Sequence, residues 1–151
     1  MGADLEVAIV RACCSRAENQ ELYWMFSRSQ LEFVLKELDV VDELTSKMEA
    51  RYQDMLLPVL SLENYFGFLA DTEKMNQKHM VLRAADENRN LRRLIVQSAH
   101  SPKFFNLTKS FISLDSFSVP QNSKHMCGAY SLGRGKVGLV PDVISICIEI
   151  S

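Results

Sequence analysis

Apolar residues recur along this chain in short runs separated by polar segments of similar length. These largely apolar runs lie at 22–26, 31–35, 55–60, 80–84, 91–96, 127–132 and 137–140. Many short runs at regular spacing are typical of small antiparallel β-barrels rather than of a parallel sheet. The pattern therefore predicts a mainly β domain.

Turn residues between the runs predict which strands pair. The runs 80–84 and 91–96 flank the polar segment 86–90, which has turn chemistry, and the runs 127–132 and 137–140 flank two glycines, Gly133 and Gly135. Both arrangements predict hairpins. A third hairpin is predicted from 22–26 and 31–35, and 104–107 and 110–114 give two further short strands.

Three segments depart from this pattern. Residues 5–16 place apolar side chains at helical spacing, which predicts an amphipathic helix in an N-terminal extension over 1–19. Residues 36–54 are acidic, with apolar positions three and four apart, and also favour a helix. In 142–151, isoleucines alternate with other residues at a period of two, which favours a strand.

The segment from Met55 to Gly67 is the most informative. It is an apolar strand containing Pro58, followed by a short helical turn that ends at the glycine. A proline cannot donate to a β-ladder, so Pro58 predicts the edge of a sheet or the rim of a barrel. Partner proteins can dock at such a rim.

Length and charge narrow the range of functions. A chain of 151 residues has the size of one domain, so we expect a single domain over 1–151. The net charge of -2 gives no field that attracts nucleic acid. The longest apolar runs are far shorter than the roughly 20 residues that cross a bilayer. Asp4 and Glu6 stand where an export signal carries basic residues, so we expect a cytoplasmic protein.

The sequence offers no clear motif for metal binding or catalysis. Cysteines at 13, 14, 127 and 147 lack the spacing of zinc sites, and we expect reduced, buried thiols. Residues 133–138 spell G-x-G-x-x-G, but Pro141 follows where a nucleotide-binding unit has a helix. We therefore predict no cofactor, no metal and no catalytic residue; an enzyme that uses Cys127 with His125 is the alternative.

Several segments resemble the CheW-like domains of bacterial chemotaxis. They stand in the family's order at 23–26, 31–35, 38–40, 58–62, 94–97, 128–132 and 137–143. The resemblance implies two intertwined five-stranded SH3-like β-barrels. The first would be built from about 20–69 with the C-terminal strands and the second from about 76–135. The N-terminal helix would be an addition to that fold, and the family has a helix where the sequence here favours a terminal strand.

The resemblance also implies a non-catalytic adaptor that binds a chemoreceptor cytoplasmic domain, a CheA-type histidine kinase, or both. The family's Asn-Leu-Arg-Gly motif falls on 51–54, where no residue agrees and Gln53 takes the place of the coupling arginine. The residues expected to bind partners are Arg51, Gln53, Leu57, Val59 and Leu60 for a receptor and Leu94 and Val96 for a kinase.

Two further expectations concern binding. Barrel rims present apolar side chains, so the adjacent aromatics at 65–66 and 104–105 are additional candidates for partner contacts. In an alternative function, the groove beside the strand that contains Pro58 would bind a small molecule, and the protein would be a small-molecule binding or sensory module. The N-terminal helix is a candidate for self-association.

Overall fold

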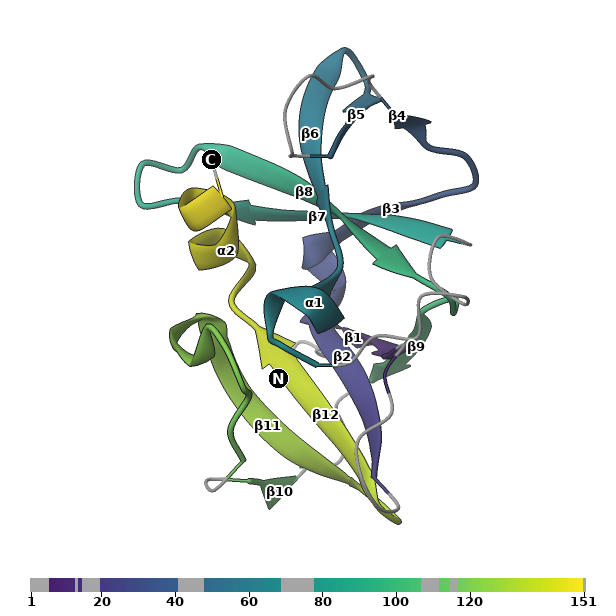
Figure 1. Cartoon of the computed structure of the whole chain (residues 1–151), viewed down its shortest axis with the longest axis vertical. Coiled ribbons are helices and arrows are strands. Elements are labelled where there is room, and N and C mark those ends of the chain that lie inside the picture. Colours follow the sequence, from purple (N-terminus) through teal and green to yellow (C-terminus); the bar gives the residue numbers. More distant parts are fainter. Residues whose placement is uncertain are drawn as a thin grey trace.

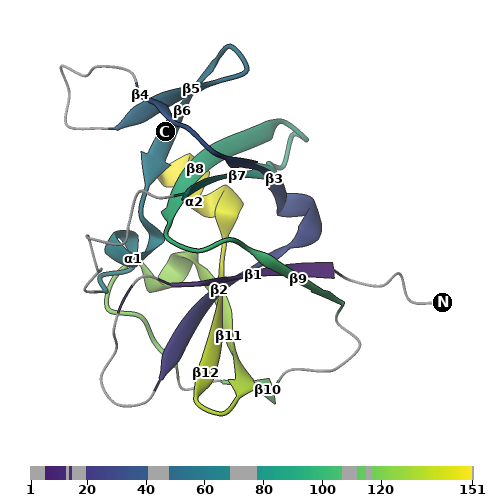
Figure 2. The same ribbon diagram turned by 90° about the vertical axis from the view of Figure 1, so that its right-hand side faces the viewer.

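The computed structural model of the chain describes residues 6–12, 14, 20–40, 48–68, 78–106, 112–114 and 117–150. Within these residues the fold is mainly β, in two curled sheets of six strands (Figures 1 and 2). The first sheet contains β1 (Glu6–Arg11), β2 (Glu21–Ser27), β9 (Lys103–Asn106), β10 (Ile112–Ser113), β11 (Met126–Gly133) and β12 (Lys136–Pro141). Its strand order is β10-β11-β12-β2-β1-β9.

The second sheet contains β3 (Leu31–Leu35), β4 (Asp39–Val40), β5 (Glu49–Tyr52), β6 (Met55–Leu60), β7 (Lys78–Ala85) and β8 (Leu91–Ser98). Its strand order is β3-β7-β8-β6-β5-β4. Two helices, α1 (Leu62–Tyr65) and α2 (Val143–Ile150), and two short 3-10 turns, η1 (Arg28–Gln30) and η2 (Ser123–His125), complete the described elements.

Two predicted hairpins are confirmed. β7 pairs with β8 and β11 with β12, both antiparallel. Between β11 and β12, Arg134 and Gly135 have φ angles of 52° and 76°. Positive φ at both central residues is the requirement of the tight two-residue hairpin turn. The glycine-rich segment is therefore a β-turn and not a phosphate-binding loop.

The third predicted hairpin is wrong. β2 lies in the first sheet between β1 and β12, whereas β3 pairs with β7 in the second sheet. The chain crosses from one sheet to the other at η1, so the polar break at 27–30 is a crossover between sheets. As a result, β2 lies in one sheet and β3 to β6 lie in the other.

The predicted N-terminal helix is wrong where the structure describes it, since 6–11 form β1. Val7, Ala8 and Val10 are buried there, and the strand is paired on both sides by β2 and β9. The β-branched side chains fit a pleated surface well, and pairing with distant strands overrides the helical spacing.

The predicted helix over 36–54 is wrong at both of its described ends. Residues 39–40 and 49–52 form β4 and β5, and 41–47 lie outside the described residues. The apolar side chains Ala50 and Tyr52 alternate along β5 and are buried beneath the hairpin that it forms with β6. Burial at a period of two outweighs the local helix propensity.

The predicted C-terminal strand is wrong, because 143–150 form α2. Val143, Ile146 and Cys147 are buried at helical spacing, and the helix packs on β7 and β8. Asp142 begins the helix: its carboxylate accepts a hydrogen bond from the Ser145 amide at 3.3 Å. This cap favours a helix despite the β propensity of the isoleucines.

Pro58 does not mark a sheet edge. β6 is paired with β5 on one side and with β8 on the other. The Val59 amide donates to the Met48 carbonyl on the β5 side. Because neighbouring backbone amides point to opposite sides of a strand, the nitrogen of Pro58 faces β8, where the ladder begins only at Val59. The missing N–H thus falls just beyond the end of that ladder.

The main core lies between the two sheets. Trp24 of β2 stacks on Phe66 with ring centroids 5.7 Å apart. Its indole Nε1–H donates to the buried carboxylate of Glu63 at 2.9 Å, and the Ser61 hydroxyl donates to the same carboxylate at 3.1 Å. The predicted helical turn before Gly67 is confirmed as α1. It joins the two sheets through this network.

Candidate functional site

The hairpin of β5 and β6 extends at the opposite end of the molecule from β11 and β12 (Figure 1). Its two turn residues, Gln53 and Asp54, have φ angles of 47° and 62°. This left-handed conformation favours glycine or asparagine, but it supplies the twist that a two-residue hairpin needs. The side chains of both residues are exposed at the tip.

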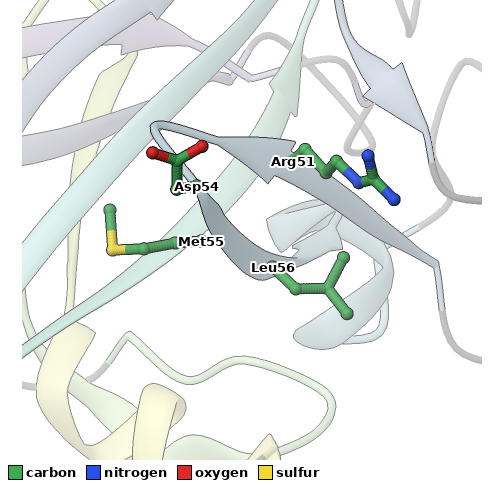
Figure 3. Close-up of a pocket in the computed structure, with 4 residues that line it drawn as sticks. All are labelled: Arg51, Asp54, Met55 and Leu56. Carbon is green, nitrogen blue, oxygen red and sulfur yellow. The ribbon is translucent and has the colours of Figure 1, made fainter.

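The hairpin carries a hollow with a volume of about 360 Å³ (Figure 3). It is lined by Arg51, Asp54, Met55 and Leu56. Arg51 and Leu56 are direct cross-strand neighbours, and Leu56 is 50% exposed. The hollow therefore combines an exposed apolar side chain with one basic and one acidic group, which is the composition of a protein-binding surface with a polar rim.

A small second core supports the hairpin from its inner face. It consists of Ala50, Tyr52, Leu57, Val59, Val81 and Ile95, all buried. Because these side chains come from β5, β6, β7 and β8, the hairpin is fixed to the body of the second sheet. The hollow is thus carried on a packed sheet rather than on an isolated loop.

A partly buried charge cluster at the edge of the second core also holds the hairpin in place. Glu32 of β3 accepts hydrogen bonds from Arg93 Nε at 2.9 and 3.0 Å. Burial alone would raise the pKa of Glu32, but hydrogen bonds from Arg93 and Tyr52 and the charge of Arg83 lower it. The pKa of Tyr52 is raised by burial and by its bond to Glu32. Tyr52 thereby ties β5 to β3.

The structure separates the predicted partner-binding residues into two groups. Arg51 and Gln53 are exposed on the hairpin, and Leu60 is half-buried against the main core. The other predicted residues lie in the interior: Leu57, Val59, Leu94 and Val96 are 0 to 8% exposed. These four side chains pack the cores and present no surface to a partner in this structure.

Leu56 is the exposed residue that sequence reasoning missed. Side chains along β6 alternate between the inner and outer faces, and Leu57 and Val59 face inward. The signal that could have found it is the period of two across Pro58, together with the charged residue Arg51 on the facing strand. Because the neighbouring residues are also apolar, the sequence alone does not show which face of the strand is exposed.

The aromatic candidates also divide. Phe66 is fully buried in the main core, whereas Phe104 and Phe105 are 48% and 47% exposed. They lie on β9, which among the described strands pairs only with β1. The Arg28 guanidinium lies over the Phe104 ring, 4.5 Å from its centroid, so this ring is already engaged in a cation–π contact.

The alternative catalytic pair is not assembled. His125 bonds through one ring nitrogen to the Ser145 hydroxyl at 2.6 Å and through the other to Glu149. Partial desolvation of its sulfur raises the pKa of the Cys127 thiol although the residue as a whole is exposed, and the charge of Asp142 adds to this. A raised pKa keeps the thiol protonated, whereas a cysteine nucleophile must be a thiolate.

Three further features concern the thiols, metal sites and membrane spans. Of the described cysteines, Cys147 is buried as expected, Cys14 is partly exposed and Cys127 is exposed. Among the described residues, no three His, Cys, Asp or Glu side chains gather as a metal site. No helix in that part of the chain is long and apolar enough to cross a membrane.

Comparison with known proteins gives a structural match and no sequence match. No family model matches the chain, and no curated protein matches it. Among solved structures, the scaffolding protein TtCheW from Thermoanaerobacter tengcongensis is similar, with a TM-score of 0.63 and 9% identity. The alignment covers 93% of this chain and 86% of that one. At this identity the likeness shows the fold, so the chain has a CheW-like fold, as its sequence segments predicted.

Proposed function

We propose that this protein is a cytoplasmic, non-catalytic adaptor in chemotaxis-type signal transduction. The proposal is supported by a fold similar to that of a scaffolding protein and by the exposed face of the β5–β6 hairpin, where an apolar side chain lies beside a charged one. The observation that carries the proposal is the pairing of Leu56 with Arg51 on a rigidly supported hairpin. Apolar side chains ringed by charge are typical of interface centres.

The finer architecture belongs to the same proposal. The two six-stranded sheets would form the walls of two intertwined SH3-like barrels of five principal strands each. The two-residue strands β4 and β10, at one end of each sheet order, would be additions to them. The groove beside β6 would then lie next to the hairpin, within reach of a receptor.

The partners proposed are the cytoplasmic domain of a chemoreceptor and a CheA-type histidine kinase. Arg51 would meet an acidic side chain of the partner, Leu56 would enter an apolar site, and Gln53 would contact the partner from the tip. Truncating a hot-spot residue at the centre of an interface costs about 2 kcal/mol or more. Replacement of Leu56 by a charge should therefore weaken binding at least tenfold.

The test uses the full chain and these two partner domains, each purified from the organism that encodes it. Isothermal titration calorimetry compares the parent with Leu56→Asp and Arg51→Glu. Leu91→Asp is the matched control, because Leu91 is 46% exposed on the same sheet but lies outside the hairpin. Loss of affinity confined to the hairpin variants supports the proposal. Absence of binding by both partners, or equal loss in the Leu91 variant, contradicts it.

The hollow also supports a second candidate, a small-molecule binding or sensory module. Its volume of about 360 Å³ is within the range of ligand pockets, roughly 300–1,000 Å³. A ligand that binds the folded state raises the melting temperature in proportion to the logarithm of its concentration. A metabolite screen by thermal shift tests this candidate, and Arg51→Glu should abolish any shift that originates in the hollow.

A further inference from the structure

The strand β9 forms one edge of the first sheet (Figure 2). It pairs with β1 on one side, and no strand of the described part of the chain lies on its other side. All four of its residues are exposed, and the side chains of Phe104 and Phe105 are 48% and 47% exposed. An open strand edge that also displays apolar side chains is a template for pairing with another chain.

The pairing of β1 with β2 shows which backbone groups of β1 face β9. The Ala12 amide donates to the Leu22 carbonyl of β2 at 2.9 Å. The N–H and C=O groups of successive residues in an antiparallel strand point alternately to the two sides. Those of Val7 and Ile9 therefore face β9.

The same alternation gives the outward groups of β9. Phe105 and Lys103 are the direct neighbours of the β1 residues that face β9, so their N–H and C=O groups bond to β1. Phe104 and Asn106 point theirs the other way, toward the open edge. The edge thus offers a donor and an acceptor at each of these two positions.

One face of this edge also carries an ordered pair of charges. Glu6 is the cross-strand neighbour of Asn106. The Arg28 guanidinium lies 4.5 Å from the centroid of the Phe104 ring and 4.0 Å from the Glu6 carboxylate. Both charged side chains are about half exposed. The acidic group therefore lies beside position 106 and the basic group beside position 104.

We propose that the open edge of β9 pairs antiparallel with the same edge of a second copy of this chain, around a two-fold axis at Phe105. In this register Phe104 of each copy lies opposite Asn106 of the other. Their outward N–H groups then donate to each other's outward C=O groups. Phe105 packs on Phe105 of the second copy at a pair without hydrogen bonds, where the side chains of an antiparallel ladder lie closest.

The edge is complementary to itself, and this favours a second copy over an unrelated strand. Because position 104 lies opposite position 106, Arg28 of each copy comes beside Glu6 of the other on the same face of the sheet. The backbone groups, the central aromatic pair and the charges are all matched by one symmetry operation. An unrelated strand would have to supply each of these features separately.

The size of the contact predicts a weak dimer. The exposed parts of the phenylalanine rings in both copies amount to on the order of 400 Å², below the roughly 1,200 Å² of a stable interface. Pro102 stands directly before β9 and has no N–H to donate, so the new ladder ends at Lys103. Since the contact uses the same edge of both copies, it closes as a pair and does not grow into a fibre.

Sedimentation equilibrium of the full chain tests the association. The measured mass should rise from 17.2 kDa toward twice that value as the concentration approaches about 1 mM. Phe105→Glu and Phe105→Lys should each raise the dissociation constant at least about tenfold, because like charges then face each other across the two-fold axis. An equimolar mixture of the two variants should associate again, because glutamate then faces lysine.

Ile112→Glu is the matched control. Ile112 is 72% exposed on β10, the strand at the other edge of the same sheet, and this variant should associate as the parent does. A parent that stays monomeric at about 1 mM overturns the proposal. An equal loss in the Ile112 variant, or a mixture of the Phe105 variants that stays monomeric, also overturns it.

Hydrogen exchange of the parent gives a second readout that does not depend on any variant. In dilute solution the amides of Phe104 and Asn106 should exchange rapidly, whereas the Phe105 amide, which bonds to β1, should exchange slowly. The first two amides should become protected as the concentration rises. Exchange of these amides at a rate independent of concentration overturns the proposal. Neither measurement involves a receptor or a kinase, so the outcome is separate from that of the adaptor function.

Discussion

Substitution of Leu94 tests the assignment of the second sheet's central strand to the interior. Leu94 is 0% exposed, faces Leu82 across the β7–β8 ladder and lies on a strand held by β7 and β6. Leu94→Ala leaves a cavity, and in a strand paired on both sides the backbone cannot collapse to fill it. At a site buried in this way, the substitution lowers the free energy of unfolding by about 3 to 5 kcal/mol. For a chain of 151 residues, that lowers the melting temperature by at least roughly 6 °C.

The matched control is Leu56→Ala, the same chemical change at a half-exposed position of the same sheet. It should change the free energy of unfolding by no more than about 0.5 kcal/mol. Urea unfolding followed by circular dichroism measures both variants, with melting temperatures as a check. If Leu94→Ala costs less than about 1 kcal/mol while it weakens partner binding, Leu94 is a surface residue and the argument from burial fails.

Three further predictions concern stability. Gly138→Ala should destabilise by about 1 to 3 kcal/mol because a Cβ there would collide with Met25, whereas Gly128→Ala meets only ordinary contacts and should be tolerated; thermal melts compare them. The Ser61 side chain accepts a hydrogen bond from the Asn64 amide at the start of α1. Ser61→Ala should therefore lower the free energy of unfolding, measured in urea, by about 1 kcal/mol. Burial lowers the pKa of His79, so as pH falls the unfolded chain binds a proton at this residue before the folded chain does. Stability should be full above about pH 6.5 and fall below it, and His79→Leu should flatten that slope in urea titrations at several pH values.

The strands that the sequence predicted well are those whose turn chemistry and periodicity agree. β7 and β8 flank a polar segment in which Asp86 accepts two amide bonds, and β11 and β12 flank a turn with Gly135 at positive φ. In both hairpins the partner is the next strand along the chain. Local information therefore suffices to predict the pairing.

The errors arise where long-range pairing or a cap decides the outcome. Nothing local to Glu6–Arg11 indicates that β2 and β9 flank it, and helical spacing was the stronger local signal. In α2 the decisive group is Asp142, a single capping residue ahead of eight residues of which five are β-branched. Strand burial also cannot be derived from an apolar run alone, which is why Leu57 and Val59 were expected at the surface.

The position of the positive charge on the β5–β6 hairpin leads to a last prediction. The resemblance to CheW-like domains implies a coupling arginine at the tip position, here Gln53, whereas this chain carries Arg51 two residues earlier, beside the exposed Leu56. Two strand residues span about 7 Å, so a partner adapted to this protein needs its acidic group displaced by that distance.

The double variant Arg51→Gln with Gln53→Arg keeps the net charge and moves it back to the tip. We expect it to bind this protein's own partner at least tenfold more weakly, as measured by calorimetry, because the acidic group no longer faces a cation. The single variant Gln53→Arg retains Arg51 and serves as the control that should keep its affinity. Equal affinity of the double variant and the parent would show that Arg51 does not face the partner, and the recognition surface would then have to be sought away from the hairpin.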